Sequence, residues 1–436
     1  MDPTPEPTTG ARAAAGSDAA TVARHPHLPA SSPGRQLGLI AAAQVLVMAC
    51  WFSASAVVPA LRAEWGVTAL EATLLTVAVQ VGFVVGAVGS AATNLADRFP
   101  AHRVMAVSAL VAATATGAIA AGVDSLAPAV VLRLVTGMAL AGVYPVGMKL
   151  MTSWFERGRG FALGVLIAAL TLGSALPQLV SSLASLPWRG VLATSAVSAV
   201  LGAVLAWALV RPGPHARPAP PLAPGFVLTL FRERGPRLAN LGYFGHMWEL
   251  YAMWTWVPAY VSASLTASAG VAPSRTVVGL TAFTVIGLAG VVGCLGAGRL
   301  GDRLGRARVA GWAMRVSAAC CVLAALVFGL SPWVVVPVLL VWGVSVIADS
   351  GLFSSCVADV VDPRYVGTAL TTQTALGFLL TVVTINAVPW VVDEAGWRWA
   401  VLLLAVGPVA GAVAMARLDV LLRRPGGVSP ASASAA

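Results

Sequence analysis

The chain has 436 residues, of which 58% are hydrophobic and only 10% are charged, whereas a soluble domain carries about a quarter charged residues. This composition excludes a water-soluble globular protein. The net charge of +10 does not indicate nucleic-acid binding either, because the basic residues form short clusters between long apolar runs. Since one membrane-spanning helix takes about 20 residues, the length accommodates twelve spans, and we expect a protein embedded in a lipid bilayer.

Twelve membrane-spanning helices are predicted from the apolar runs between charged residues and Pro or Gly breaks. The first six cover residues 36–61, 69–93, 104–123, 127–151, 160–181 and 189–211. The second six cover residues 238–262, 276–300, 307–330, 332–357, 366–392 and 397–420. The chain is thus predicted to form an N-terminal bundle, residues 36–211, and a C-terminal bundle, residues 238–424.

The remaining segments are polar or rich in proline. Residues 1–35 lack the apolar core of a signal peptide, and we expect them to form a disordered cytoplasmic tail. Residues 425–436 are expected to form a second disordered tail. Between the bundles, residues 212–237 contain the run PGPHARPAPPLAP and several arginines, so we predict a cytoplasmic linker.

The distribution of basic residues predicts the orientation in the membrane. If both termini are cytoplasmic, 21 of the 27 Lys and Arg residues lie on the cytoplasmic side. Four lie on the other side, namely Arg62, Arg189, Arg275 and Arg398, and Arg133 and Arg315 lie within spans. The positive-inside rule therefore favours cytoplasmic termini. All but one of these 27 residues are Arg, which points to a GC-rich bacterial genome and a location in the bacterial cytoplasmic (inner) membrane.

Two loops about half the chain apart share a spacing of Asp and Arg. The sequence GRLGDRLGRAR at 298–308 contains Gly298, Asp302, Arg303, Gly305 and Arg306. A degenerate copy, TNLADRFPAHR at 93–103, contains Asp97, Arg98 and Arg103. Arg157 and Gly160 also align with Arg364 and Gly367, and Trp188-Arg189 aligns with Trp397-Arg398. These three anchors predict a duplicated six-helix unit.

The loop at 298–308 resembles the cytoplasmic signature G-x-L-x-D-R-x-G-R-x-R of major facilitator superfamily transporters. Arg133 and Gly137 in span 4 likewise resemble that family's R-x-x-x-G element, whose Arg has been linked to proton transfer. The resemblance implies an all-α membrane protein with twelve transmembrane helices in two pseudo-symmetric six-helix bundles. It further implies a central cavity between the bundles and alternating access by a rocking motion.

The resemblance also implies a latch on the cytoplasmic side. In the family each loop pairs with the helix start of the opposite half, where an Asp can dock at the positive end of the helix. Carried over, Asp302 is expected to face the start of span 5 near Arg159, and Asp97 the start of span 11 near Arg364. The first copy departs from the signature at both glycine positions, so the second copy is the better match.

Span 7 carries the most reactive side chains, in GYFGHMWELYAMWTW at 242–256. His246 and Glu249 lie on one helix face, and Tyr251 is a neighbouring hydrogen-bonding aromatic. A buried Glu near a His is suited to binding and releasing a proton, because burial disfavours the charged carboxylate and His titrates near neutral pH. A structural hydrogen bond between the two is the alternative.

Other polar residues in the spans are candidates for the substrate pathway. Asp349 in span 10 either takes part in transport or pairs with Arg315 of span 9. Arg133 and Lys149, the sole Lys, are candidate cationic contacts, although Lys149 can equally be one more cytoplasmic charge. The remaining candidates are Gln44 and Trp51 of span 1 and Gln373 of span 11.

We therefore expect a proton-coupled secondary transporter of a small organic anion or metabolite, acting as a monomer. No nucleotide-binding motif, nucleophile elbow or metal-ligand spacing accompanies the spans, so we expect no enzyme activity, cofactor, metal or nucleic-acid partner. A nitrate/nitrite porter is one alternative, but such porters use an Arg within spans 2 and 8, whereas here span 2 has none and span 8 has only Arg299 at its inner end. A drug/proton antiporter is another, although of its span 5 element only Gly164, Gly173 and Pro177 remain. A non-transporting sensor would need an appended signalling domain.

Overall fold

The computed structural model describes residues 32–155, 158–183, 186–216 and 222–423. The predicted tails lie almost wholly outside these residues, as does the middle of the predicted linker. The described part of the first half forms the following helices, which we call the first helix group: α1 (Pro33–Met48), η1 (Ser55–Val57), α2 (Val58–Trp65), α3 (Ala69–Ala92), α4 (Leu95–Arg98), α5 (Ala101–Gly122), α6 (Leu126–Leu140), α7 (Tyr144–Thr152), α8 (Arg159–Leu183) and α9 (Trp188–Ala208).

A short helical connection, η2 (Pro224–Phe226) and α10 (Thr229–Arg232), leads into the second half. The helices that follow form the second helix group: α11 (Arg234–Ala269), α12 (Arg275–Phe283), η3 (Thr284–Leu288), α13 (Ala289–Leu304), α14 (Arg306–Val327), α15 (Pro332–Ala348), α16 (Ser350–Val360), η4 (Pro363–Tyr365), α17 (Val366–Ala395), α18 (Trp397–Leu404) and α19 (Val406–Arg423).

The predicted fold class, an all-α membrane protein, is confirmed. Ten helical segments among the described residues are long and apolar enough to cross a membrane, and they correspond to predicted spans 2–6 and 8–12. Predicted span 1 is interrupted, because α1 ends at Met48 and the helix resumes only at η1 and α2. Predicted span 7 is α11, a single helix of 36 residues that carries several polar side chains.

Local sequence signals set the helix boundaries. Gly66 ends α2 in the left-handed region, at φ 66°, where a residue with a side chain would be strained. The next helix begins with a capping box, in which the Thr68 hydroxyl accepts from the Glu71 N–H and Glu71 accepts from the Thr68 N–H. Gly305, at φ 99°, makes the turn between α13 and α14.

The two helix groups repeat one architecture. Predicted span 4 is interrupted between α6 and α7, and span 10 is interrupted at Asp349, between α15 and α16. Glycines allow equivalent helices to touch backbone to backbone. A Cβ atom on Gly137 would lie 2.1 Å from the Val79 carbonyl oxygen, and one on Gly343 would lie 2.0 Å from that of Val285.

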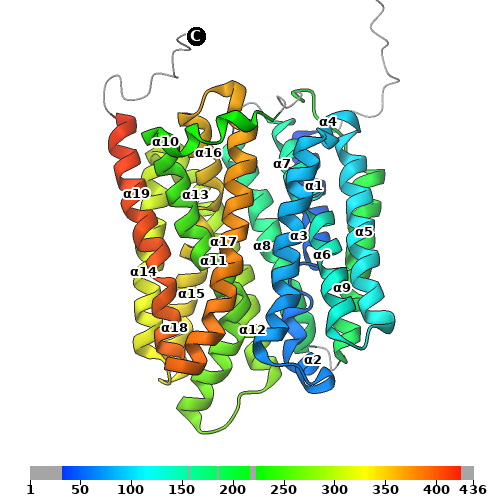
Figure 1. Cartoon of the computed structure of the whole chain (residues 1–436), viewed down its shortest axis with the longest axis vertical. Helices are drawn as coiled ribbons and strands as arrows, with labels where there is room; N and C mark the ends of the chain where they lie inside the picture. The colour runs from blue at the N-terminus through cyan, green and yellow to red at the C-terminus, as the bar shows by residue number, and fades with distance from the viewer. Residues whose placement is uncertain (1–31, 156–157, 184–185, 217–221, 424–436) are drawn as a thin grey trace, which may run out of the picture. The chain divides into compact units, whose positions relative to one another are not determined.

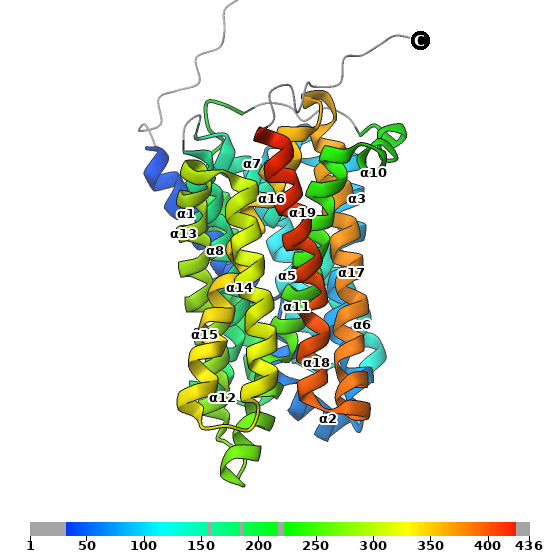
Figure 2. The ribbon, with the colours of Figure 1, turned by 90° about the vertical axis from the view of Figure 1, so that its left-hand side faces the viewer.

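The groups also meet through equivalent helices. Figures 1 and 2 show the two groups as neighbouring bundles of roughly parallel helices, and α17 of the second group packs on α3 of the first. The helix of the first group that is equivalent to α17 is α8, and it packs on α13 of the second group. Figure 1 places α4, α7, α10 and α16 at one end of the helices and α2, α12 and α18 at the other. We call the former the basic end, because it carries Arg98, Lys149, Arg303 and Arg306.

Candidate functional site

A cavity of about 520 Å³ lies between the two helix groups, at the end opposite the basic end. The first group contributes η1, α2 and the ends of α3, α8 and α9, and the second contributes α11 and α12. Hydroxyl and amide side chains line part of the wall, namely Ser55, Thr73, Thr76, Gln178, Ser181, Thr255 and Ser262. The charged residues of the described lining are Arg62 and Arg275, and no carboxylate is among them.

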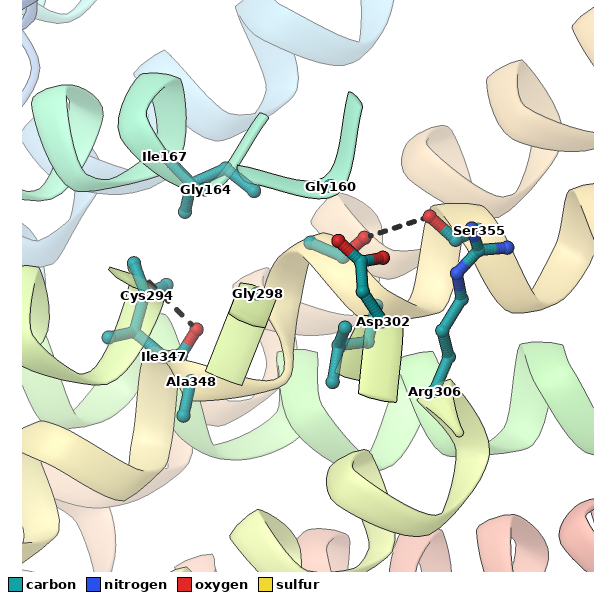
Figure 3. A pocket seen from close by; sticks show the side chains of 12 residues that line it. Gly160, Gly164, Ile167, Cys294, Gly298, Asp302, Arg306, Ile347, Ala348 and Ser355 are labelled. Carbon is teal, nitrogen blue, oxygen red and sulfur yellow. Dashed lines mark hydrogen bonds between the residues drawn. The ribbon is translucent and has the colours of Figure 1, made fainter. Parts of the chain in front are cut away.

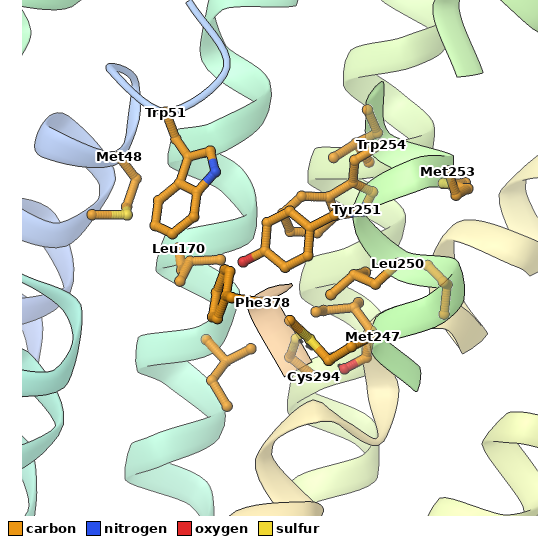
Figure 4. Close-up of a cluster of buried hydrophobic side chains, with 14 of the residues drawn as sticks. Met48, Trp51, Leu170, Met247, Leu250, Tyr251, Met253, Trp254, Cys294 and Phe378 are labelled. Carbon is orange, nitrogen blue, oxygen red and sulfur yellow. Dashed lines mark hydrogen bonds between the residues drawn. The ribbon is translucent and has the colours of Figure 1, made fainter. Parts of the chain in front are cut away.

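An aromatic cluster closes the cavity toward the basic end, and we call it the aromatic floor. It consists of Trp51, Phe52, Phe83, Tyr251, Trp254 and Phe378, which come from both groups. Trp51 lies 5.8 Å from Tyr251 between ring centroids, and Phe83 lies 4.5 Å from Phe378. Figure 4 shows Trp51 and Tyr251 facing each other across the boundary between the groups. The predicted candidates Trp51 and Tyr251 therefore share one site.

Arg133 lies behind this floor, fully buried on α6. Its guanidinium donates to the carbonyl oxygens of Cys50 at 2.7 Å and of Leu75 at 3.1 Å, and also to that of Trp51. The Trp51 and Cys50 carbonyls belong to the stretch where span 1 leaves the helix. Arg133 thus supplies hydrogen bonds that the interrupted helix lacks. The described cavity lining does not include Arg133, and its expected contact with the substrate stays a prediction.

Glu249 faces the interior of the second helix group. Its Oε1 atom accepts hydrogen bonds from Ser317 Oγ at 2.7 Å, Cys321 Sγ at 3.1 Å and Trp342 Nε1 at 2.5 Å. The side chain is 2% exposed. Buried carboxylates require such partners, because an unpaired one pays the full cost of lost hydration. Glu249 is therefore held by α14 and α15, and the cavity lining does not include it.

His246 pairs with Asp349 rather than with Glu249. Its Nδ1 atom lies 2.8 Å from Asp349 Oδ1, and both side chains are almost fully buried. Asp349 occupies the interruption between α15 and α16. Arg315 is exposed on α14, so the alternative that Asp349 pairs with Arg315 is wrong. The expected structural bond between His246 and Glu249 is wrong as well, since α11 directs the two toward different partners.

At the basic end, Asp302 lies against the start of α8. A Cβ atom on Gly160 would be only 2.7 Å from Asp302 Oδ1 and 2.8 Å from Oδ2. Figure 3 shows this carboxylate directed toward Gly160, with Gly298 and Arg306 beside it. The Arg159 side chain is outside the described residues. Asp302 thus bridges the two helix groups at a helix start, where a carboxylate is favourable.

The other residues of the second loop bind within their own group or face outward. Arg306 pairs with Asp359 at 2.9 Å, and Arg303 is exposed. Gly298 lets α13 approach α8, because a Cβ there would lie 3.3 Å from the Gly160 carbonyl oxygen. Gly305 forms the turn already described.

The first loop has different partners from those expected. Asp97 Oδ1 pairs with Lys149 Nζ at 2.5 Å, and Nζ also donates to the Ala96 carbonyl at 3.0 Å. Arg364, the expected partner of Asp97, pairs with Asp362 at 2.7 Å instead. Hydrogen bonds from Arg364 hold the pKa of the Asp362 carboxyl below its usual value. Lys149 therefore braces the first loop, and the cavity lining does not include it.

The remaining basic residues of the first loop lie at the surface. Arg98 is exposed, and the Arg103 guanidinium lies over the Trp207 ring, 5.5 Å from its centroid. Such a contact contributes about 0.5–1 kcal/mol at an exposed site.

Several buried amides have no hydrogen-bond partner among the described residues. They include both side-chain polar atoms of Gln44 and of Gln80, and Nε2 of Gln373. Gln44 and Gln373 were expected candidates, whereas Gln80 was missed. The signal for it was present in the sequence, because Thr73, Thr76 and Gln80 recur at i, i+3 and i+7 on one face of α3. The stripe carries no charge and so did not stand out.

The comparison with known proteins covers most of the chain. A family model described as Major Facilitator Superfamily matches residues 40–385. The matched region includes both Asp-containing loops, the aromatic floor and the buried carboxylates. No curated protein sequence matches the chain.

Proposed function

The chain belongs to the major facilitator superfamily, and on this premise we propose that this membrane transporter moves a small organic solute by alternating access, driven by a proton gradient. The observation that carries the proposal is the asymmetry along the helices. A cavity of about 520 Å³ lies between the helix groups at one end, whereas the aromatic floor and the Asp302 contact join the groups toward the basic end. Such a shape is one of the two states that rocking bundles exchange.

The proposed orientation places the basic end in the cytoplasm. It is supported by the positive-inside rule, because 21 of the 27 Lys and Arg residues are assigned to the cytoplasmic side when both termini are taken as cytoplasmic. The cavity then opens outward, and both termini are cytoplasmic. The proposed location is the cytoplasmic membrane of a bacterium, with the chain acting as a monomer.

The proposed proton site is the buried group formed by Glu249, His246 and Asp349 in the second helix group. Ionisable side chains inside a membrane are costly and usually functional. Glu249 and Tyr251 are two residues apart on α11, with Glu249 in the group interior and Tyr251 in the aromatic floor. A change of protonation at Glu249 can therefore shift the part of α11 that carries Tyr251. Tyr251 belongs to the aromatic floor, which lies at the inner end of the cavity.

The nitrate/nitrite and drug-antiport alternatives have less support. The α3 helix carries no Arg, and Arg299 at the end of α13 is exposed with its guanidinium over the Phe161 ring. A cationic drug would meet Arg62 and Arg275 at the cavity mouth without any carboxylate in the described lining.

Spin-label distances test alternating access without knowledge of the substrate. One labelled pair, Ala60 on α2 and Ala263 on α11, spans the cavity, and a second, Phe99 and Leu422, spans the basic end. The five native cysteines are buried and should label little. Lowering the pH from 8 to 5 should shorten one distance and lengthen the other. Two distances that stay fixed, or move together, would contradict the proposal.

A further inference from the structure

The charged residues of the described cavity lining are both arginines. Arg62 on α2 and Arg275 on α12 come from opposite helix groups, and both are exposed. Arg62 Nε donates to the Val67 carbonyl at 3.4 Å, so its side chain lies along the rim. A cleft with low-dielectric walls and charges of one sign raises the local concentration of the opposite ion. The mouth therefore favours entry of anions.

Below the mouth the lining continues without charge. On three helices, the residue one turn deeper than a cavity residue carries an uncharged hydrogen-bonding group. Gln80 follows Thr76 on α3, Ser174 precedes Gln178 on α8, and Tyr251 precedes Thr255 on α11. These three deeper residues are buried. Three helices thus each carry a buried, uncharged polar residue one turn below the cavity lining, and we call these three residues the polar shell.

Two residues of this shell and one residue of the aromatic floor have unused hydrogen-bonding capacity. Both side-chain polar atoms of Gln80, the Ser174 hydroxyl and Trp51 Nε1 are buried without hydrogen-bond partners in the described part of the chain. A buried donor left unpaired destabilises the protein, because it has lost its hydration without gaining a partner. Three of these atoms, Gln80 Nε2, Ser174 Oγ and Trp51 Nε1, can donate. Together they match the acceptor oxygens of a carboxylate.

The floor presents flat apolar surfaces beside these donors. Tyr251 stacks on Trp51 with an interplanar angle of 30° and on Phe52 with an angle of 17°. Trp256 adds an indole to the cavity wall, and its own N–H already donates to the Ile385 carbonyl. Near-parallel rings favour a planar guest, because offset stacking requires flat partners.

We propose that the transported solute is a small aromatic carboxylate. Its carboxylate is bound by Gln80, Ser174 and Trp51, its ring packs on the aromatic floor, and Arg62 and Arg275 draw it into the cavity. The proposal rests on the transport function and names the substrate class of the same cavity. It assigns binding roles to Gln80 and Ser174, which carry no charge and lie one turn below the open cavity.

The test is equilibrium binding of three probes to the full chain in lipid nanodiscs. Radiolabelled benzoate and benzamide have nearly the same shape, but only benzoate is charged at pH 7. Unlabelled cyclohexanecarboxylate keeps the charge and removes the flat ring, and serves as a competitor. We expect benzoate to bind at least about tenfold more tightly than benzamide, because a charge-assisted hydrogen bond is about twice as strong as a neutral one. Cyclohexanecarboxylate should compete poorly.

Variants separate the two parts of the site. Gln80→Leu should abolish most benzoate binding, and Thr76→Val, which removes a hydroxyl that already bonds Ser55, should have a smaller effect. Arg275→Gln should weaken binding by about two- to fivefold at low salt, as expected for a solvent-exposed charge at the cavity mouth, and less at high salt. The matched control is Arg398→Gln, an exposed Arg near the same end that is not in the lining.

Several outcomes would overturn the proposal. Equal affinity for benzoate and benzamide would contradict selection of a charged group. Competition by cyclohexanecarboxylate as strong as that by unlabelled benzoate would contradict selection of a flat ring. Absence of benzoate binding to protein whose spin-label distances still exchange with pH would reject the substrate class while leaving alternating access intact. If Gln80→Leu is not monodisperse, Ser174→Ala replaces it, and unchanged benzoate binding in that variant would reject the donor assignment.

Discussion

Asp302 and Gly160 touch across the boundary between the two helix groups. An ideal Cβ on Gly160 would lie within 2.8 Å of both carboxylate oxygens, so no side chain fits there without moving Asp302. The contact joins the end of α13 to the start of α8 at the basic end. Because one partner in this contact is a glycine, substituting alanine adds a single methyl group that should displace the Asp302 carboxylate.

Gly160→Ala should open the basic end. Alanine is a better helix former than glycine by about 1 kcal/mol, so any loss of closure comes from the displaced Asp302. We expect faster labelling of a cysteine introduced at Ser355, which lines the pocket beneath the contact, by a membrane-impermeant maleimide applied from the basic end. The control is Gly296→Ala on α13, where a Cβ meets nothing within 4 Å. Equal labelling in the two variants would show that the contact does not close this end.

Arg133→Gln should destabilise the protein by about 2–4 kcal/mol, because carbonyls of the interrupted span 1 lose a charged donor. The stability of Arg133→Lys should lie between that of Arg133→Gln and that of the native chain, since one ammonium cannot reproduce the planar set of donors. The measurement is thermal unfolding in detergent. The matched control, Arg315→Gln, also removes an Arg from within a span, but Arg315 is exposed. A comparable loss in Arg315→Gln would mean that the bonds to Cys50 and Trp51 are not what matters.

Glu249→Gln and Asp349→Asn should each alter the pH dependence of the distance between labels at Ala60 and Ala263. Both residues are buried in the proposed proton site, so neutralising one removes a group that exchanges a proton during the cycle. Glu394→Gln, at an exposed position outside this group, should leave the pH midpoint unchanged. If neither buried variant moves the midpoint, the proton site lies elsewhere.

Gly137→Ala and Gly343→Ala should destabilise the two groups to a similar degree, by about 1–3 kcal/mol each, the usual cost of overpacking. At both positions the added Cβ would lie about 2 Å from a backbone carbonyl oxygen, so the helices must separate. Thermal unfolding measures the loss. A large effect at one position with none at the other would contradict the equivalence of the two helix pairs.

Much of the helical fold is predictable from the sequence, since apolar runs end at Gly, Pro or charged residues. The predicted span 69–93 is α3 with Ala69–Ala92, whereas the predicted span 276–300 continues to Leu304, so Asp302 lies in the last turn of α13 and the expected loop is reduced to the turn at Gly305. The interruption of span 1 is different. Residues 49–54 contain neither Pro nor Gly, and carbonyls at the break accept hydrogen bonds from Arg133, about 80 positions away. Local sequence carries no sign of such a tertiary contact.

In the candidate site, too, the local sequence identifies residues but not their tertiary partners. Composition singles out Glu249, His246 and Asp349, because charges are rare inside spans. It cannot assign their partners, which depend on how α11, α14 and α15 cross. Uncharged groups such as Gln80 are harder to find, since one amide among apolar residues becomes informative only when the surrounding helices leave it unpaired.

The two Asp-containing loops should differ in function, and coupling energies can show it. Asp302 reaches the opposite helix group, whereas Lys149 and Asp97 join α7 and the α4 region within the first group. A double-mutant cycle with Asp97→Asn and Lys149→Gln should give a coupling of about 0.5–1 kcal/mol, typical of a partly exposed pair. The cycle of Asp97→Asn with Arg364→Gln should be additive within about 0.3–0.5 kcal/mol. Coupling between Asp97 and Arg364 would instead indicate that the first loop also closes across the groups, as the family resemblance implies.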